Sequence, residues 1–309
     1  MARVSSQSDS STLRGYLLIH ASVLLFGFTP IMGRLITVDA VTLVWWRMSL
    51  AGAVLLLLPM TWRGFRTLSP RLALGCCLAG GVLAITWALF YLSVKLTDAS
   101  VAAVCLATSP LFVALFGPVV ARRPYRRIDL LLALAMIPGV ALVVGGIPHA
   151  MYLGLGVGLL SAAVLVVFSS LNKLLASRIQ PLSATCIEML VGAAFLTVMI
   201  ALLPRADAGF LLPRGRNLWL LLVFAIAFTA VPIAMLLASL RDISVFAQQV
   251  VVNLEPVYAV LLAIPILAEQ RQLTALFYLG VLVVVGTVVA EPMLRWLRRR
   301  FTSGHPAQP

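Results

Sequence analysis

Residues 244–268 read SVFAQQVVVNLEPVYAVLLAIPILA, a run of 25 residues in which Glu255 is the single charged side chain. A helix of about 20 apolar residues crosses the roughly 30 Å hydrocarbon layer of a bilayer, so this stretch predicts a membrane-spanning helix. A charge at the bilayer centre costs about 2.5–3.5 kcal/mol on insertion scales. The carboxylate therefore needs a reason to be there, and it is the first candidate functional group.

The whole chain has the composition of a membrane protein. Of its 309 residues, 62% are hydrophobic and 11% are charged, against about 45–50% and 25% in soluble domains. This excludes a soluble fold, because too few polar residues remain to cover a core. Ten apolar runs recur along the chain, and we expect each to be a transmembrane helix: 15–33, 41–60, 72–94, 100–120, 130–147, 153–171, 184–204, 218–240, 244–268 and 273–290.

Arginine and lysine are distributed unevenly over the segments between these runs. Of the 23 basic residues, 16 fall in one set of loops and tails, 6 fall in the other set, and Arg47 lies within a run. Basic residues resist translocation and stay in the cytoplasm. Both termini are therefore predicted to be cytoplasmic. The net charge of +13 follows from this bias, so we expect no nucleic-acid partner.

The two halves of the chain resemble each other. SPLF at 109–112 corresponds to EPVY at 255–258, and WRM at 46–48 corresponds to IEM at 187–189. Five helices per half is an odd number, so the halves must be inverted, as in secondary transporters that bind substrate at the membrane midplane. We predict an all-α polytopic membrane protein with two inverted five-helix repeats at 15–147 and 148–290, between tails at 1–14 and 291–309.

Polar side chains in the run at 244–268 form the main candidate site for a substrate or a proton. Pro256 follows Glu255 and has no N–H, so it leaves the carbonyl of Val252 free. On a continuous helix, further polar side chains share the stripe of Glu255 or flank it: Gln248, Gln249 and Asn253. Glu255 binds a coupling proton or a substrate ammonium group on one interpretation. On the other, it is a hydrogen-bonded carboxyl that only holds helices together.

Five other side chains are candidates for the same role, each with a structural alternative. Glu188 and Arg47 are equivalent in the repeat but lie at opposite depths, about 15 Å apart, so we expect no direct pair. Arg47 either joins the site or extends to the outer headgroups. Glu188 either gates or couples transport or hydrogen-bonds a neighbouring helix, and His20 is either a proton relay or an interhelical donor. Trp87 and Tyr91 either line a substrate wall or simply pack.

Prolines and the absence of other motifs complete the pattern. Four prolines inside the runs are expected to kink helices and free carbonyls: Pro30, Pro110, Pro232 and Pro256. The four cysteines lack metal-ligand spacing, and the chain has no Walker motif and no cluster that resembles a catalytic triad. We expect no metal, no cofactor, no enzymatic activity and no transport driven by ATP.

These residues carry a resemblance to a known family. LFG at 25–27, WR at 46–47, LEPVY at 254–258 and the Glu at 269 resemble the EamA family of the drug/metabolite transporter superfamily. The resemblance covers roughly 15–290 and implies ten helices, an inverted duplication and, usually, export of small metabolites or amino acids. The first half departs from the family pattern, because Arg122 and Arg123 stand where Glu269 stands in the second half.

The resulting expectation is an exporter of the bacterial inner membrane that works by alternating access around a midplane cavity. Its partners would be a small-molecule substrate, membrane lipids and, if transport is proton-coupled, protons. Two alternatives remain open from the residues alone. One is a membrane-embedded enzyme or scaffold, and the other is a flippase whose cavity opens sideways to lipid.

Overall fold

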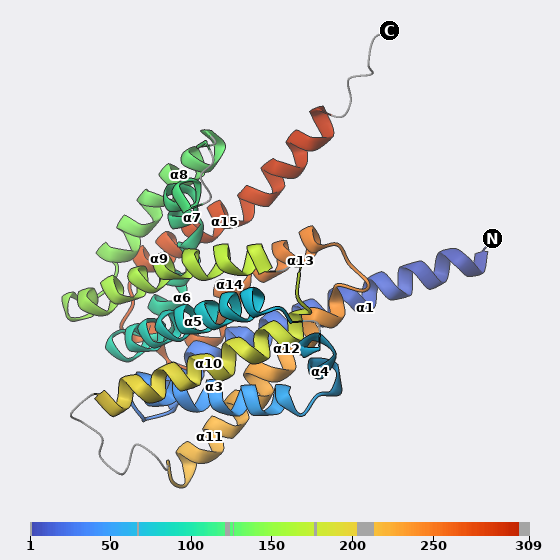
Figure 1. Ribbon diagram of the computed structural model, residues 1–309. Helices are drawn as coiled ribbons and strands as arrows, with labels where there is room; N and C mark the ends of the chain where they lie inside the picture. The colour runs from blue at the N-terminus through green and yellow to red at the C-terminus, as the bar shows by residue number, and fades with distance from the viewer. Residues whose placement is uncertain are drawn as a thin grey trace.

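The computed structural model describes residues 2–66, 68–120, 124–125, 127–175, 178–202 and 213–302, and helices joined by short connections make up these ranges (Figure 1). The elements are α1 (Ala2–Gly27), α2 (Thr29–Leu35), α3 (Ala40–Leu56), α4 (Pro59–Phe65), α5 (Pro70–Leu96), α6 (Ala99–Ala107), α7 (Ser109–Val120), α8 (Arg127–Gly145), α9 (Tyr152–Leu175), α10 (Pro181–Leu202), α11 (Arg216–Ala225), α12 (Val231–Ser239), α13 (Val245–Val252), α14 (Glu255–Leu267) and α15 (Ala275–Thr302), with short helical turns η1 (His149–Met151), η2 (Ile226–Ala230) and η3 (Glu269–Arg271).

Seven segments of the described chain are long and apolar enough to cross a membrane: Thr12–Leu35, Pro70–Leu96, Ala99–Phe116, His149–Leu175, Pro181–Leu202, Arg216–Ser239 and Val250–Leu267. The bent pair α3 and α4 makes an eighth if it is counted as one span, and Asp129–Gly145 and Ala275–Ala290 are shorter apolar helices. The predicted all-helical polytopic membrane fold is thus confirmed. Each expected run coincides with one of these segments, but ten crossings stay a prediction.

The expected helix at 41–60 is wrong in its last turn. α3 ends at Leu56, and α4 begins at Pro59 after a bend of 88°. Leu58 is extended, as is usual before proline, and Pro59 has no N–H to continue the helical ladder. Side chains supply the missing donors, since Thr61 Oγ1 donates to the Leu55 carbonyl at 2.7 Å.

Three other runs that were expected to be continuous are each divided just before a proline. The breaks lie at Phe28, at Thr108 and at Asn253–Leu254. In each case the proline stands in the first turn of the next helix, where a missing N–H costs no helical hydrogen bond. The fourth proline, Pro232, follows the π-helical turn η2. Each of these runs still forms one span without a bend above 40°, so the kinks expected at the prolines stay a prediction.

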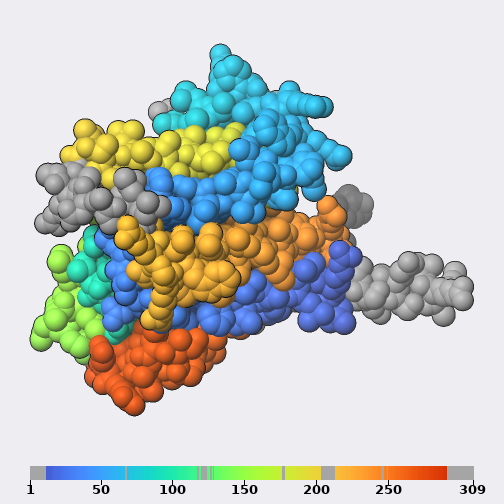
Figure 2. Space-filling model, turned by 90° about the horizontal axis from the view of Figure 1, so that it is seen from below, coloured from blue at the N-terminus to red at the C-terminus, as the bar shows by residue number. Residues whose placement is uncertain are grey.

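The helices pack around two large apolar cores and several smaller buried clusters. α3, α5 and α10 enclose one core, and α6, α8 and α15 enclose the other. Close approach needs small residues: a Cβ on Gly80 of α5 would lie 2.6 Å from the Glu188 carbonyl oxygen of α10. Figure 2 shows α11 and α12 (orange) between α10 (yellow) and α15 (red) on one face. Large apolar side chains such as Leu153 and Leu282 remain about 70% exposed, as suits a surface that faces lipid.

Candidate functional site

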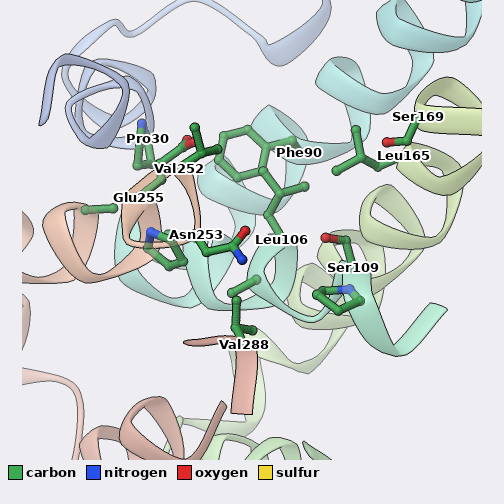
Figure 3. A pocket seen from close by; sticks show the side chains of 15 residues that line it. Pro30, Phe90, Leu106, Ser109, Leu165, Ser169, Val252, Asn253, Glu255 and Val288 are labelled. Atoms are coloured by element: carbon green, nitrogen blue, oxygen red, sulfur yellow. The ribbon is translucent and has the colours of Figure 1, made fainter. Parts of the chain in front are cut away.

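A cavity of about 310 Å³ lies where two of the broken helices meet. α2, α5, α6, α7, α9, α13, α14 and α15 contribute to its wall. Most lining side chains are apolar, and the polar ones are four: Ser109, Ser169, Asn253 and Glu255 (Figure 3). This combination of an apolar wall and a few polar groups is typical of a small-molecule site.

The break between α13 and α14 brings a carboxylate and an amide to the cavity. Asn253 and Leu254 form a turn between α13 and α14, and α14 begins at Glu255 with Pro256 in its first turn. The amide of Asn253 points toward the middle of the cavity (Figure 3). Glu255 is half-buried and stands at the positive end of the α14 dipole, which favours a negative charge there.

The break between α6 and α7 approaches the same cavity from another side. α6 ends at Ala107, and Thr108 closes the turn by donating from Oγ1 to the Cys105 carbonyl at 2.6 Å. α7 then begins at Ser109, followed by Pro110, and both line the cavity. Ser109-Pro110 is the pair that aligns with Glu255-Pro256 in the internal repeat. The two equivalent breaks therefore share one cavity.

Arg47 is enclosed among aromatic rings rather than extended to the membrane surface, so the alternative that it reaches the outer headgroups is wrong. The residue is 4% exposed. Its Nε donates to Thr229 Oγ1 at 2.9 Å, and Nη1 donates to the Tyr91 hydroxyl at 2.8 Å. The guanidinium carbon lies 3.7 Å from the ring centre of Trp87 and 4.7 Å from that of Phe224. Such contacts stabilise a buried cation through the negative ring faces.

The Arg47 cluster lies behind one wall of the cavity. The Tyr91 hydroxyl contacts the Thr29 carbonyl at 3.4 Å, and the neighbours of these residues, Phe90 and Pro30, line the cavity. Among the described residues, Arg47 and Glu255 form no ion pair. The charge of Arg47 still acts on the carboxylate of Glu255. Arg47 thus supplies a positive charge near the cavity without lining it.

The model of the EamA-like transporter family matches this chain twice, at residues 13–145 and at residues 151–290. The chain belongs to the EamA-like transporter family. The predicted family within the drug/metabolite transporter superfamily is thereby confirmed. Membership makes the chain a multi-pass membrane transporter of small molecules, in a family that is generally not enzymatic.

A solved crystal structure also resembles this EamA transporter. The two share 17% sequence identity, with a TM-score of 0.61 over 94% of this chain and 99% of the other. At that identity the likeness establishes the fold alone. No curated protein matches the chain.

Several predicted site residues of the transporter lie away from the cavity. Gln248 is 8% exposed, and its Nε2 donates to the Leu236 carbonyl at 2.6 Å and to Ser239 Oγ at 3.1 Å. Gln248 therefore does not line the cavity with Glu255, as the predicted stripe required, because its amide binds residues of α12. The side chain of Gln249, together with Arg122 and Arg123, lies outside the described residues.

The other candidates have partners of their own. His20 Nδ1 lies 3.0 Å from the Tyr258 hydroxyl, one turn beyond Glu255 on α14. Glu188 is 4% exposed, with the Asn172 side chain beside its carboxyl. As expected, Glu188 forms no ion pair with Arg47 in the described part of the chain. Trp87 and Tyr91 contact Arg47, and neither lines the cavity.

Sequence reasoning missed Ser109 as a site residue and gave Ser169 no place in the site. The signal for Ser109 was available, because the repeat aligns it with Glu255. Ser169 had no such signal. It reaches the cavity because α9 packs against α7, and that contact joins segments far apart in the sequence.

Proposed function

We propose that this transporter is a secondary-active carrier that binds its substrate in the cavity between the α6/α7 and α13/α14 breaks. One observation carries the proposal: Ser109-Pro110 and Glu255-Pro256 are equivalent in the repeat and line the same cavity. Broken helices around a central site are the common architecture of carriers with inverted repeats. We infer ten membrane crossings, in two inverted halves at 15–147 and 148–290, that expose the cavity alternately to each side.

The proposed substrate is a small amphiphilic metabolite of the amino-acid type. A cavity of about 310 Å³ is at the small end of ligand pockets, which span about 300–1,000 Å³. Glu255 would hold an ammonium group. Ser109, at the positive end of the α7 dipole, would hold a carboxylate. The apolar wall with Phe90 and Leu106 would accept the remainder of the molecule.

Export from the cytoplasm of a bacterium, with both termini on the cytoplasmic side of the inner membrane, is the orientation that we propose. The bias of 16 basic residues to 6 between the two sets of loops supports it. A reporter fused after Pro309 should therefore be active only in the cytoplasm. Activity of that reporter outside the cell would contradict the orientation.

The experiment that tests the function compares metabolites inside and outside cells that express the transporter or lack it. The proposal predicts that an amino-acid-like solute accumulates in the medium of expressing cells only. Cells that express Glu255→Gln should resemble cells without the transporter, while the protein still reaches the membrane. A solute profile that is the same in all three would contradict the proposal.

A further inference from the structure

A cluster of charged residues closes one end of the helix bundle. Arg34 lies at the end of α2, Asp98 precedes α6, and Glu269 begins η3. Asp98 is 2% exposed and Glu269 is 3% exposed. Arg34 Nη2 lies 3.3 Å from Asp98 Oδ1. We call these three residues the end cluster.

The end cluster joins segments that also form the cavity wall. The two oxygens of Glu269 accept the first amides of α6, from Ala99 at 2.8 Å and from Ser100 at 3.0 Å. α2, α6 and α14 each contribute residues to the cavity. Separation of these three segments at this end therefore requires the contacts of the end cluster to break.

An apolar plug lies between the cavity and the end cluster. Ile31, Ala99 and Ala263 form one buried cluster, with exposures of 0–1%. On each of the three segments a cavity residue comes first, then the plug residue and then the cluster residue: Pro30, Ile31 and Arg34 on α2; Ala103, Ala99 and Asp98 at α6; Ala259, Ala263 and Glu269 at α14 and η3. The plug and the end cluster together close the cavity at this end.

Buried polar atoms without hydrogen-bond partners among the described residues lie in the end cluster and beside it: Asp98 Oδ2 in the cluster, and Ser100 Oγ and the Tyr278 hydroxyl oxygen next to it. Ser100 is fully buried, and Tyr278 lies close enough to Asp98 and Glu269 to interact with both charges. An ionised oxygen without a partner in a buried site is costly. A proton on Asp98 Oδ2 removes that charge and turns the atom into a hydrogen-bond donor.

The titratable groups around Asp98 come from four elements. Arg34 on α2 is cationic, Glu269 on η3 is anionic, and Tyr278 on α15 is neutral. Lys95 at the end of α5 donates to the Ile36 carbonyl and lies near Arg34. Arg271 on η3 is exposed. Two buried carboxylates thus lie close together, and only Asp98 forms an ion pair among the described residues, with Arg34. Two neighbouring buried acids with one paired cation favour one bound proton.

We propose that Asp98 binds a proton when this end of the transporter is closed and releases it when the end opens. The proposal rests on the alternating access proposed above, because it needs an open state in which Asp98 meets water. The proton comes from the solution at this end of the protein and returns to it, so no other reactant takes part. Binding of this proton to Asp98 would make closure of this end dependent on pH.

The direction of the pH dependence follows from the environment of Asp98. Burial first, and then the charge of Glu269, raise the pKa of Asp98, while Arg34 acts in the opposite sense. In an open state Asp98 would have its ordinary pKa, so the closed state binds the proton more tightly. Closure is therefore favoured at low pH, and this advantage is lost as the pH rises through the raised pKa.

Hydrogen exchange of the intact, substrate-free transporter in lipid nanodiscs tests this proposal. The amides of Ala99 and Ser100 report closure, because both donate to Glu269. After correction for intrinsic chemical exchange, their protection should fall about tenfold or more between about pH 5.5 and pH 8. In Asp98→Asn, which imitates the protonated acid, protection should stay high and independent of pH.

One further variant makes the result specific. Asp242→Asn alters the other described Arg–Asp pair, Arg14–Asp242, and should keep the wild-type pH response. The measurement uses no substrate, so failure of the cavity proposal is distinguishable from failure of this one. Wild-type protection that does not change with pH would overturn the proposal. So would an Asp98→Asn protein with the wild-type pH response. If Asp98→Asn does not fold, the wild-type pH curve alone decides.

Discussion

The α6/α7 and α13/α14 breaks have the same backbone plan and different chemistry. Each has a short turn just before a proline, and in each the next helix starts at the cavity. The residue before the proline is Ser109 in one and Glu255 in the other. The position of the proline therefore determines where the turn forms in both halves, whereas the residue before the proline determines the charge that each break brings to the cavity. The cavity takes its negative charge from the second half alone.

Arg47 gives the largest test of this asymmetry, because its charge acts on the Glu255 break. Arg47→Met keeps the apolar volume but removes the counter-charge, and we expect transport to fall about tenfold or more. Stability should change by only about 1 kcal/mol, since replacement of a buried charge by an apolar side chain is often neutral. Transport assays in proteoliposomes and thermal unfolding check the two effects.

Glu188 is the matched control for Arg47, because it occupies the equivalent position in the other half. Neither residue lines the cavity, but Arg47 interacts with the charge of Glu255 and Glu188 does not. Glu188→Gln should therefore leave transport within about twofold of wild type. Equal losses in Arg47→Met and Glu188→Gln would show that the halves contribute alike and would contradict the asymmetry.

Moving the carboxylate to the other break should have a smaller effect, but it tests the equivalence of the two breaks more specifically. In Glu255→Gln the addition of Ser109→Glu returns one acid to the cavity, at the equivalent position of the repeat. We expect recovery of about threefold in substrate affinity over Glu255→Gln alone, since the charge is restored but displaced. Ser169→Glu in the same background is the control outside the breaks. Equal recovery by both would contradict the equivalence of Ser109 and Glu255.

The prolines should have the smallest effects. Pro256→Ala supplies an N–H and allows α13 and α14 to join, which would withdraw the Asn253 amide from the cavity. We expect substrate affinity to fall about twofold to threefold. Pro110→Ala should lower substrate affinity less than Pro256→Ala. At that break the Thr108 hydroxyl donates to the Cys105 carbonyl and helps to hold the turn without the proline. A larger loss in Pro110→Ala, measured by equilibrium binding, would reverse this ranking.

Sequence reasoning located the helices because apolar runs report lipid exposure directly. It also placed Glu255 and Asn253, two of the four polar residues that line the cavity, from the rarity of polar groups in such runs. It failed for Gln248, because its amide binds Leu236 and Ser239 of α12, and that contact depends on packing between helices. The prolines indicated where the helical hydrogen-bond pattern is interrupted in each run. The sequence did not show that a turn separates two helices at three of these places.

The burial of Arg47 was beyond the reach of local sequence patterns. Its enclosure depends on Trp87 and Tyr91 of α5 and on Phe224 of α11, which are distant in the chain. An arginine near a helix end suggests extension toward the headgroups. In the folded protein α3 packs between α5 and α11, so Arg47 contacts three aromatic rings and does not reach the headgroups.

Equilibrium binding of the solute identified by metabolite comparison, to purified wild-type protein, Glu255→Gln and Ser109→Ala, tests the central claim most directly. The claim is that the second-half carboxylate binds the substrate. Glu255→Gln should weaken binding about tenfold or more, which is at least about 1.4 kcal/mol. Ser109→Ala should weaken it about threefold. Wild-type affinity in Glu255→Gln across about pH 5.5 to 8 would contradict the claim and leave Glu255 with a structural role only.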